Sequence, residues 1–182
     1  SSGDPAGVSH VSFCYDLELK VTKPAQTTFT RTYNWNIAKS VSPDTHNLFR
    51  GDSGTSTYTV QVTQTGSTDS AWAVSGSIAV YNPTTSSVSV TGVSDSVSGD
   101  ISPTVNCGVS FPYTLAAKGT LNCTYSSNLP DGTNRTNTAA ATSGTANVGN
   151  GSGAAAVNFG APTTEVRKSI NVDDSNGSTW PF

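Results

Sequence analysis

The sequence contains no methionine, and charged residues make up only 12% of its 182 positions. Nine lysines and arginines stand against twelve acidic residues, so no basic surface indicates a nucleic-acid partner. No apolar run approaches the roughly 20 residues that a membrane-spanning helix requires. These shortages disfavour a nucleic-acid-binding protein and a protein with a membrane span.

Residues suited to catalysis or metal binding are also scarce. The two histidines, His10 and His46, adjoin no nucleophile and have no ligand spacing with any cysteine. Glu18 and Glu165 are the only glutamates, and the aspartates lie mainly in expected turns, which disfavours the carboxylate pair of a glycosidase. We therefore expect a protein that is not an enzyme and that holds no metal and no cofactor.

Serine and threonine are abundant instead, with 27 of each, or about three residues in ten. This composition is typical of secreted bacterial β-proteins, although it would also suit a disordered stalk. The alternation of apolar residues described next disfavours the stalk. The chain starts with SSGDPAG rather than with a charged and apolar leader, and we interpret it as a mature or excised product.

Residues 10–21, HVSFCYDLELKV, alternate between polar and apolar side chains without a break. This period of two predicts a strand with one buried face. The apolar face carries Val11, Phe13, Tyr15, Leu17, Leu19 and Val21. The strand either completes the chain's own sheet or inserts into the open edge of a neighbouring copy, and burying its apolar face contributes several kcal/mol.

The rest of the chain brings the expected total to nine or ten short strands, with turn residues between them and no helical periodicity. The main strand segments are 29–41, 56–63, 71–81, a strand from Val88 with a bulge at Gly92–Val93, 136–142, 154–159 and 164–172. We expect an all-β fold, namely an immunoglobulin-like antiparallel β-sandwich over residues 27–172. Residues 1–26 are expected to form an N-terminal arm with the donor strand, and residues 173–182 a polar C-terminal tail.

Two of the three cysteines flank a predicted hairpin. Cys107 and Cys123 enclose two apolar segments, and the residues AKG between these segments can make the turn. A disulfide across them would contribute about 3 kcal/mol, whereas two buried free thiols are the alternative. Cys14 lies on the polar face of the first strand, and it is either a free thiol or an intermolecular link.

Lys39 lies on the apolar face of its expected strand, where an unpaired charge is costly. Surface pilins join such a lysine to an asparagine with a nearby carboxylate as catalyst, forming an intramolecular isopeptide bond. Asn137 and Asp95 are partners for Lys39 by residue type alone. The alternative, which we favour, is a lysine whose ammonium reaches solvent. Arg50–Ser53 spells RGDS, which we interpret as an ordinary turn.

Four phrases carry a resemblance to a known family: SHVSFCYDLELKVTK, RTYNWNIAKSV, WAVSGSIAVYNP and VNCGVSFPYTLAAKGTLNCTYSSNLPDGTNRTNTA. In their order, they resemble a bacterial secreted repeat domain found in large surface proteins, and the resemblance covers most of residues 9–172. It implies an immunoglobulin-like fold without enzymatic activity and an extracellular, structural or adhesive role. In that family a cysteine often stands at the position of Ser169, so Cys14 would have lost an internal partner here.

These observations predict a structural subunit of an extracellular surface filament or pilus-like fibre. Its main partners would be copies of itself, assembled head to tail by exchange of the first strand, with a host or carbohydrate surface as a further partner. Trp180 and Phe182 at the chain end would reinforce the contact. The alternative is a monomeric carbohydrate- or receptor-binding module, or a spacer, of a bacterial surface adhesin.

Overall fold

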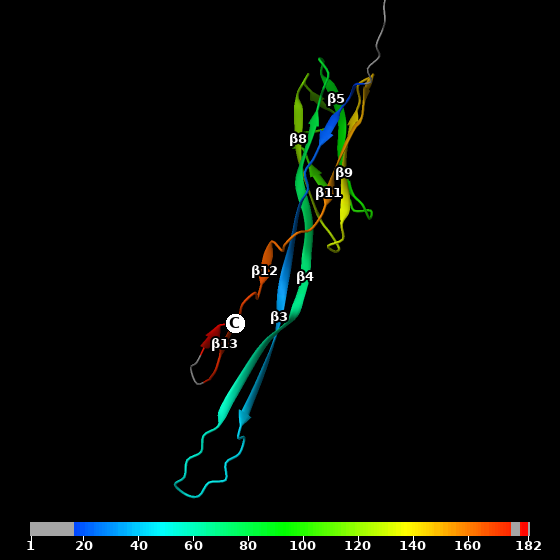
Figure 1. Ribbon diagram of the computed structural model, residues 1–182. Helices are drawn as coiled ribbons and strands as arrows, with labels where there is room; N and C mark the ends of the chain where they lie inside the picture. The colour runs from blue at the N-terminus through cyan, green and yellow to red at the C-terminus, as the bar shows by residue number, and fades with distance from the viewer. Residues whose placement is uncertain (1–16, 176–178, 182) are drawn as a thin grey trace, which may run out of the picture. The chain divides into compact units, whose positions relative to one another are not determined.

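The structure is a computed structural model, and it describes residues 17–175 and 179–181 (Figure 1). Every regular element in this part of the chain is a strand, and the strands form several sheets that pack together. The all-β fold is therefore confirmed, and the arrangement agrees with a β-sandwich, while the immunoglobulin-like topology stays a prediction. Over the same residues, no helix has the length and apolar character needed to cross a membrane.

The chain divides into two compact units. Unit 1 contains the described parts of Ser1–Gln26, Val74–Ser127 and Asn134–Asn158, and unit 2 contains those of Thr27–Ala73, Asn128–Thr133 and Phe159–Phe182. The strands are β1 Leu17–Glu18, β2 Lys20–Thr22, β3 Gln26–Ser42, β4 Thr57–Tyr81, β5 Val88–Val97, β6 Thr104–Asn106, β7 Tyr113–Leu115, β8 Thr120–Asn128, β9 Arg135–Ser143, β10 Val148–Gly149, β11 Gly151–Val157, β12 Thr164–Val166, β13 Asn171–Asp173 and β14 Thr179–Pro181.

Unit 1 is built from two layers. One sheet has the strand order β11-β9-β5-β7, and the other brings together β2, the later part of β4, β8 and β6. Strands of both layers alternate between buried and exposed residues, as the period of two requires. The interior holds apolar side chains from both layers: Leu19, Val21, Val74, Ile78, Val80, Val88, Val90, Val97, Leu115, Leu121, Ala139, Ala141 and Val157.

The predicted bulge in β5 is confirmed. The pairing of β5 with β9 shifts between Val90 and Gly92, and it then continues with Asp95 opposite Ala139 and Val97 opposite Asn137. An extra residue in one strand changes which side chains face inward. Because of this shift, Asp95 and Val97 both lie on the buried face of the sheet.

The described part of the first strand pairs within its own chain. β2 runs antiparallel to β4, with Val21 opposite Val80, and β1 runs parallel to β10. Leu19 and Val21 are 1% and 7% exposed, whereas Leu17 is 41% exposed. A Cβ atom on Gly153 of β11 would lie 2.2 Å from the Val21 carbonyl oxygen, so glycine is required for this close approach. The predicted assembly residues Val11, Phe13 and Tyr15, and Cys14 with them, lie outside the described residues.

The predicted Cys107–Cys123 disulfide is present, with Cα atoms 3.9 Å apart. The hairpin expected to form it is not the one observed. β6 pairs antiparallel with β8 so that Asn106 stands opposite Thr124. The next pair in this register is Cys107, just after β6, and Cys123, within β8. β7 instead pairs with β5 in the opposite sheet, since the turn before β8 crosses between the layers.

Replacing both Cys107 and Cys123 with alanine is expected to lower the free energy of unfolding of the chain by about 3 kcal/mol, because the unfolded chain is no longer constrained. Urea unfolding followed by fluorescence measures the loss. Reductant should destabilise the wild-type protein by a similar amount and leave the double variant unchanged. A reductant effect on the double variant would show that another bond is responsible.

The long strand β4, whose residues up to Ala73 belong to unit 2, differs from the sequence prediction. The segments 56–63 and 71–81 were expected as separate strands, but β4 runs without interruption from Thr57 to Tyr81. The polar residues between them looked like a loop, yet Asp69 accepts two hydrogen bonds of 2.7 Å from the Arg31 guanidinium on β3. Gly66 and Ala71 adopt positive φ angles of 143° and 55° within this strand.

The C-terminal part of unit 2 also contains more strand than expected. The single strand predicted for residues 164–172 is divided into β12, which runs parallel to β3, and β13. Arg167 adopts a positive φ of 56° between them. The expected polar tail contributes β14, which pairs antiparallel with β13 and places Trp180 opposite Val172. Phe182 lies outside the described residues.

Candidate functional site

Three polar side chains occupy positions on the buried faces of unit 1 that the strand pattern assigns to apolar residues. Lys23 follows Leu19 and Val21 at the same spacing of two, and Asp95 precedes Val97 in β5. Asn137 precedes Ala139 in β9. The residues are 9%, 8% and 0% exposed in this order, so all three lie in the interior.

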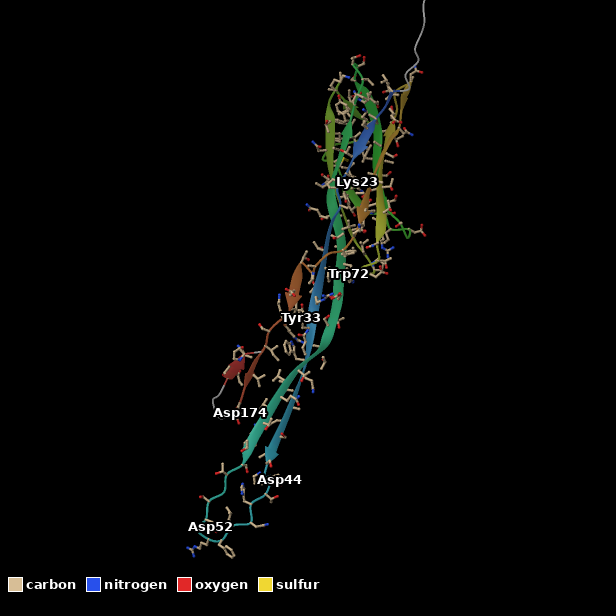
Figure 2. All side chains as sticks on the ribbon, viewed as in Figure 1. Lys23, Tyr33, Asp44, Asp52, Trp72 and Asp174 are labelled. Carbon is tan, nitrogen blue, oxygen red and sulfur yellow. A yellow bond between two sulfur atoms is a disulfide. The ribbon has the colours of Figure 1, made fainter. Side chains whose placement is uncertain are left out.

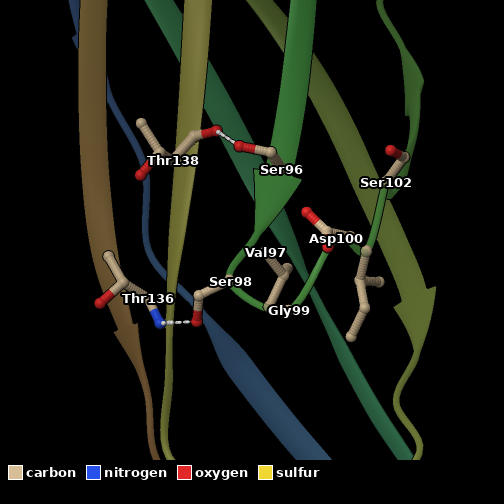
Figure 3. A pocket seen from close by; sticks show the side chains of 9 residues that line it. Ser96, Val97, Ser98, Gly99, Asp100, Ser102, Thr136 and Thr138 are labelled. Atoms are coloured by element: carbon tan, nitrogen blue, oxygen red, sulfur yellow. Dashed lines mark hydrogen bonds between the residues drawn. The ribbon is translucent and has the colours of Figure 1, made fainter.

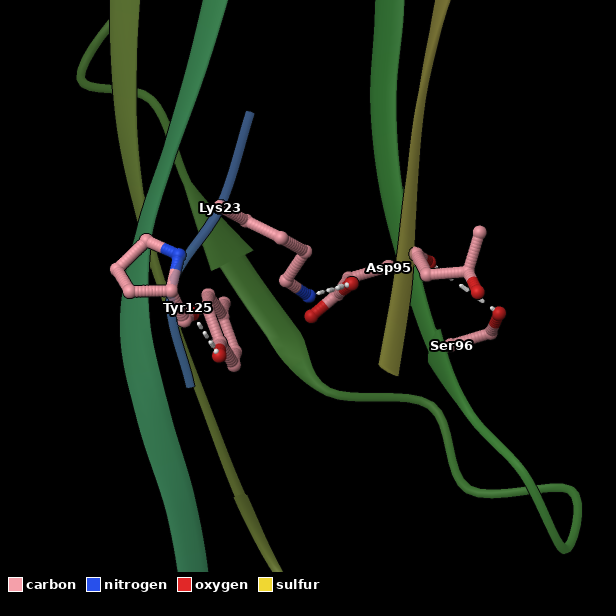
Figure 4. Close-up of polar contacts among 6 residues, drawn as sticks. Lys23, Asp95, Ser96 and Tyr125 are labelled. Carbon is pink, nitrogen blue, oxygen red and sulfur yellow. Dashed lines mark hydrogen bonds and ion pairs between the residues drawn. The ribbon is translucent and has the colours of Figure 1, made fainter. Parts of the chain in front are cut away.

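An ion pair joins the first two of these residues across the interior. The Lys23 ammonium donates a hydrogen bond to Oδ1 of Asp95, and both side chains are 0% exposed (Figure 4). The Lys23 Nζ atom also lies 3.8 Å from the centre of the Tyr125 ring, where a cation is attracted by the ring face. Tyr125 is held in place because its hydroxyl donates a hydrogen bond of 2.6 Å to the Pro24 carbonyl.

The remaining polar atoms of the group are unsatisfied. Oδ2 of Asp95 and both amide atoms of Asn137 are buried without a hydrogen-bond partner among the described residues. Leaving a buried polar group unpaired costs about 1–3 kcal/mol. Asn82 shows the ordinary alternative, because its equally buried amide donates to the carbonyls of Leu115 and Ala116. The unpaired amide of Asn137 therefore requires a separate explanation.

The sheet register brings Asp95 and Asn137 together. Asp95 stands opposite Ala139 and Asn137 opposite Val97, so the two polar residues are diagonal neighbours on the same face of adjacent strands. Side chains in this relation lie within reach of each other. Tyr125 belongs to the same interior, since the Lys23 Nζ atom that pairs with Asp95 lies 3.8 Å from the centre of its ring. We call Lys23, Asp95, Tyr125 and Asn137 the Lys23 cluster.

Burial sets the protonation properties of the cluster. Desolvation lowers the pKa of Lys23 below its usual value, although the hydrogen bond and the charge of Asp95 oppose this change. Burial raises the pKa of Tyr125 to about 12, and the Asp95 charge adds to the rise. A polar contact with the Asn137 side chain opposes the rise, although neither amide atom of Asn137 makes a hydrogen bond of normal geometry. The cluster thus combines an amine that loses its proton more easily than usual, a carboxyl group to accept that proton and an unpaired carboxamide.

Lys39, which the sequence named only as the less favoured isopeptide candidate, has a different environment from Asp95 and Asn137. Lys39 lies in unit 2, where its ammonium is 2.9 Å from Oδ2 of Asp174 and its side chain is 48% exposed. The hydrogen bond with Asp174 raises the pKa of Lys39. Asp95 and Asn137, the other two residues of the predicted isopeptide site, lie in unit 1, where Lys23 takes the expected place of Lys39.

Sequence reasoning missed Lys23 because the following proline marked it as a strand break. The signal was nevertheless present, since Leu17, Leu19, Val21 and Lys23 continue one period of two. A lysine in phase with the apolar face of a strand requires a buried partner. Asp95 shows the same signal, but only after the β5 bulge is taken into account.

Two surface hollows of unit 1 are lined by residues of a different kind. One hollow of about 460 Å³ lies at the turn after β5 and is lined mainly by hydroxyl groups, with Asp100 as its titratable residue (Figure 3). Another, of about 450 Å³, lies against Pro24 and Tyr125 beside the cluster. In the described part of the chain, no three His, Cys, Asp or Glu side chains gather in a way that could hold a metal ion.

Unit 2 carries an exposed loop between β3 and β4 (Figure 2). The RGDS segment lies in this loop, where the Asp52 amide donates to the Phe49 carbonyl at 3.0 Å and closes a turn. Phe49 is 86% exposed and Leu48 is 49% exposed. The loop therefore displays apolar surface next to polar turn residues.

Comparison with known proteins adds no relative. The chain matches no protein-family model, no curated protein and no solved structure. The likeness to bacterial secreted repeat domains is therefore carried by the sequence phrases alone. The fold, the disulfide and the Lys23 cluster are the features from which the function has to be inferred.

Proposed function

We propose that the chain is a non-enzymatic structural module of an extracellular surface protein, such as a fibre or the stalk of an adhesin. The observation that carries this proposal is the Cys107–Cys123 disulfide in a β-sandwich. Disulfides persist mainly in oxidising environments outside the cytoplasm. The resemblance to bacterial surface repeats supports the same setting.

The chemistry of unit 1 also supports a structural role. The disulfide ties the end of β6 to β8 within one sheet, and the Lys23–Asp95 ion pair joins a residue of the first layer to one of the second. Lys23, Asp95 and Asn137 lie in the interior and line neither of the two hollows described above. Interactions of this kind connect strands to each other, as a module that transmits force requires.

The first strand bears on how copies associate. Leu19 and Val21 fill their places in the interior from within the same chain. An identical strand from a neighbouring copy would fill the same places and produce a strand-exchanged fibre. The cis pairing of β2 favours a module that folds alone, and strand exchange remains a prediction about the assembled form.

We expect the full chain to elute as a monomer in size-exclusion chromatography with light scattering, both with and without reductant. Deleting residues 1–22 should open the interior at Leu19 and Val21 and cause aggregation or unfolding. A synthetic peptide of residues 8–24 should restore a folded complex with the deleted chain. Regular fibres of the full chain in negative-stain electron microscopy would instead establish strand exchange, and fibres that dissociate only on reduction would identify Cys14 as the link.

A second candidate function is a binding module. It is favoured by the loop between β3 and β4, because Phe49 is 86% exposed there beside the RGDS turn. Exposed aromatic residues on loops are common in recognition surfaces. A structural module with an adhesive loop would combine the two candidate functions.

A further inference from the structure

We propose that Lys23 and Asn137 form an intramolecular isopeptide bond in unit 1, with Asp95 as the catalytic residue that moves the protons. The reaction belongs to the chain itself and occurs once per molecule, so it does not depend on the proposed function. The residues come from β9, from β5 and from the segment that follows β2. Three observations carry the proposal: the buried ion pair, the unpaired carboxamide and the sheet register.

The amine must be neutral before it can attack a carbonyl carbon. The Lys23 ammonium already shares a hydrogen bond with Oδ1 of Asp95, so a carboxylate is in position to take its proton. Both side chains are removed from solvent, and water does not stabilise the charged forms. Transfer of one proton along this hydrogen bond converts the ion pair into a neutral amine and a carboxylic acid.

The acceptor of the amine is the Asn137 carboxamide. This side chain is 0% exposed, and neither of its amide atoms has a hydrogen-bond partner among the described residues. A structural amide in the same interior, Asn82, uses its amide group in several hydrogen bonds to the backbone. The free Oδ2 of Asp95 is also unpaired, and its diagonal position next to Asn137 makes it the group available to protonate the amide.

The step balances without any other reactant. Nζ of Lys23 attacks Cγ of Asn137, and a bond between Nζ and Cγ forms. The bond from Cγ to Nδ2 breaks, and Nδ2 takes its additional proton through Asp95 and leaves as ammonia. Starting from the ion pair, one proton remains on Asp95, so hydrogens and charge are conserved. No group is oxidised or reduced, and the product is a secondary amide between the two side chains.

The bond would connect the two layers of unit 1. Lys23 follows β2, which pairs with β4, whereas Asn137 belongs to β9 in the opposite sheet. The Cys107–Cys123 disulfide cannot do this, because it joins strands of a single sheet. The isopeptide bond would keep the first strand attached to the sandwich even when the hydrogen bonds of β2 are broken.

The test is the mass of the full wild-type chain, reduced and denatured before mass spectrometry. We expect a mass lower than that of the sequence by about 17 Da, the loss of one ammonia. A proteolytic digest should contain one branched peptide in which Lys23 is joined to Asn137. Mapping is essential because Asn150–Gly151 and Asn176–Gly177 can also lose ammonia by forming succinimides.

The variants Lys23→Ala, Asn137→Ala and Asp95→Ala should each have the full mass of their sequence. Lys39→Ala is the matched control and should retain the deficit, since Lys39 pairs with Asp174 in unit 2. A wild-type chain at the full sequence mass would overturn the proposal, whatever the folding of the variants. A deficit that maps only to a succinimide, or that persists in Lys23→Ala, would overturn it as well.

Discussion

Replacing Asp95 with alanine is expected to lower the free energy of unfolding of the chain by about 3–5 kcal/mol. In the structure the Lys23 side chain is 0% exposed and Asp95 accepts its hydrogen bond, so the substitution leaves a buried ammonium without this partner. The Tyr125 ring face offers only a weak replacement for this carboxylate. Urea unfolding at neutral pH, followed by tryptophan fluorescence and circular dichroism, measures the loss.

Two further variants make this result interpretable. Asp44→Ala removes an exposed carboxylate whose partner is the neighbouring Thr45 hydroxyl, and it should leave stability nearly unchanged. The double variant Asp95→Ala with Lys23→Met removes the unpaired Lys23 charge, and it should recover the electrostatic part of the lost free energy of unfolding. Any loss that remains combines the contribution of the proposed covalent bond with the changed packing at the two positions. Equal stability of Asp95→Ala and Asp44→Ala would contradict a buried ion pair.

Replacing Phe29 with alanine is expected to destabilise unit 2 by about 3–5 kcal/mol. Phe29 is 4% exposed, and its ring stacks on that of Trp72 with centroids 4.3 Å apart. The Phe159 ring completes the group, with its centroid 4.7 Å from that of Trp72 in an edge-on arrangement. Removal of the phenyl ring leaves a cavity beside two aromatic side chains that cannot collapse into it.

Phe49→Ala is the matched control for this substitution, because the same chemical change is made at a residue that is 86% exposed. It should leave stability almost unchanged. Hydrogen exchange of the β3 amides distinguishes a local loss in unit 2 from unfolding of the whole chain. Comparable destabilisation by the two variants would show that Phe29 is not a core residue of unit 2.

Much of the fold was predictable because strand alternation is a local property of the chain. The β3 strand, the small-residue strands β9 and β11 and the β5 bulge follow from period-two patterns and glycine positions. The continuity of β4 was not predictable, because its polar middle is kept in the strand by a long-range partner. The Arg31–Asp69 hydrogen bonds connect β3 to that segment, and the local sequence pattern does not predict them.

Two residues of the candidate site, Asp95 and Asn137, were named from the sequence, but Lys23 was not. Asn137 and Asp95 were named by residue type, and Lys39 was named because it lies on the apolar face of its expected strand, although an ammonium that reaches solvent was the favoured interpretation. In the structure Lys39 reaches Asp174 near the protein surface, and Lys23 occupies the interior position. Sequence alternation indicates which residues share a face of one strand, but it cannot indicate which strands face each other.

The sequence by itself determined the fold class and the alternation that buries Leu19 and Val21. These features depend on the spacing of apolar residues along the chain. Residues spaced by two form strands because local steric preferences favour an extended backbone and because one face of the strand can then be buried. Only the tertiary structure decided that Lys23, Asp95 and Asn137 meet in one interior. Their meeting depends on the register of β5 with β9 and on the packing of two sheets, and these are set by contacts between residues far apart in the chain.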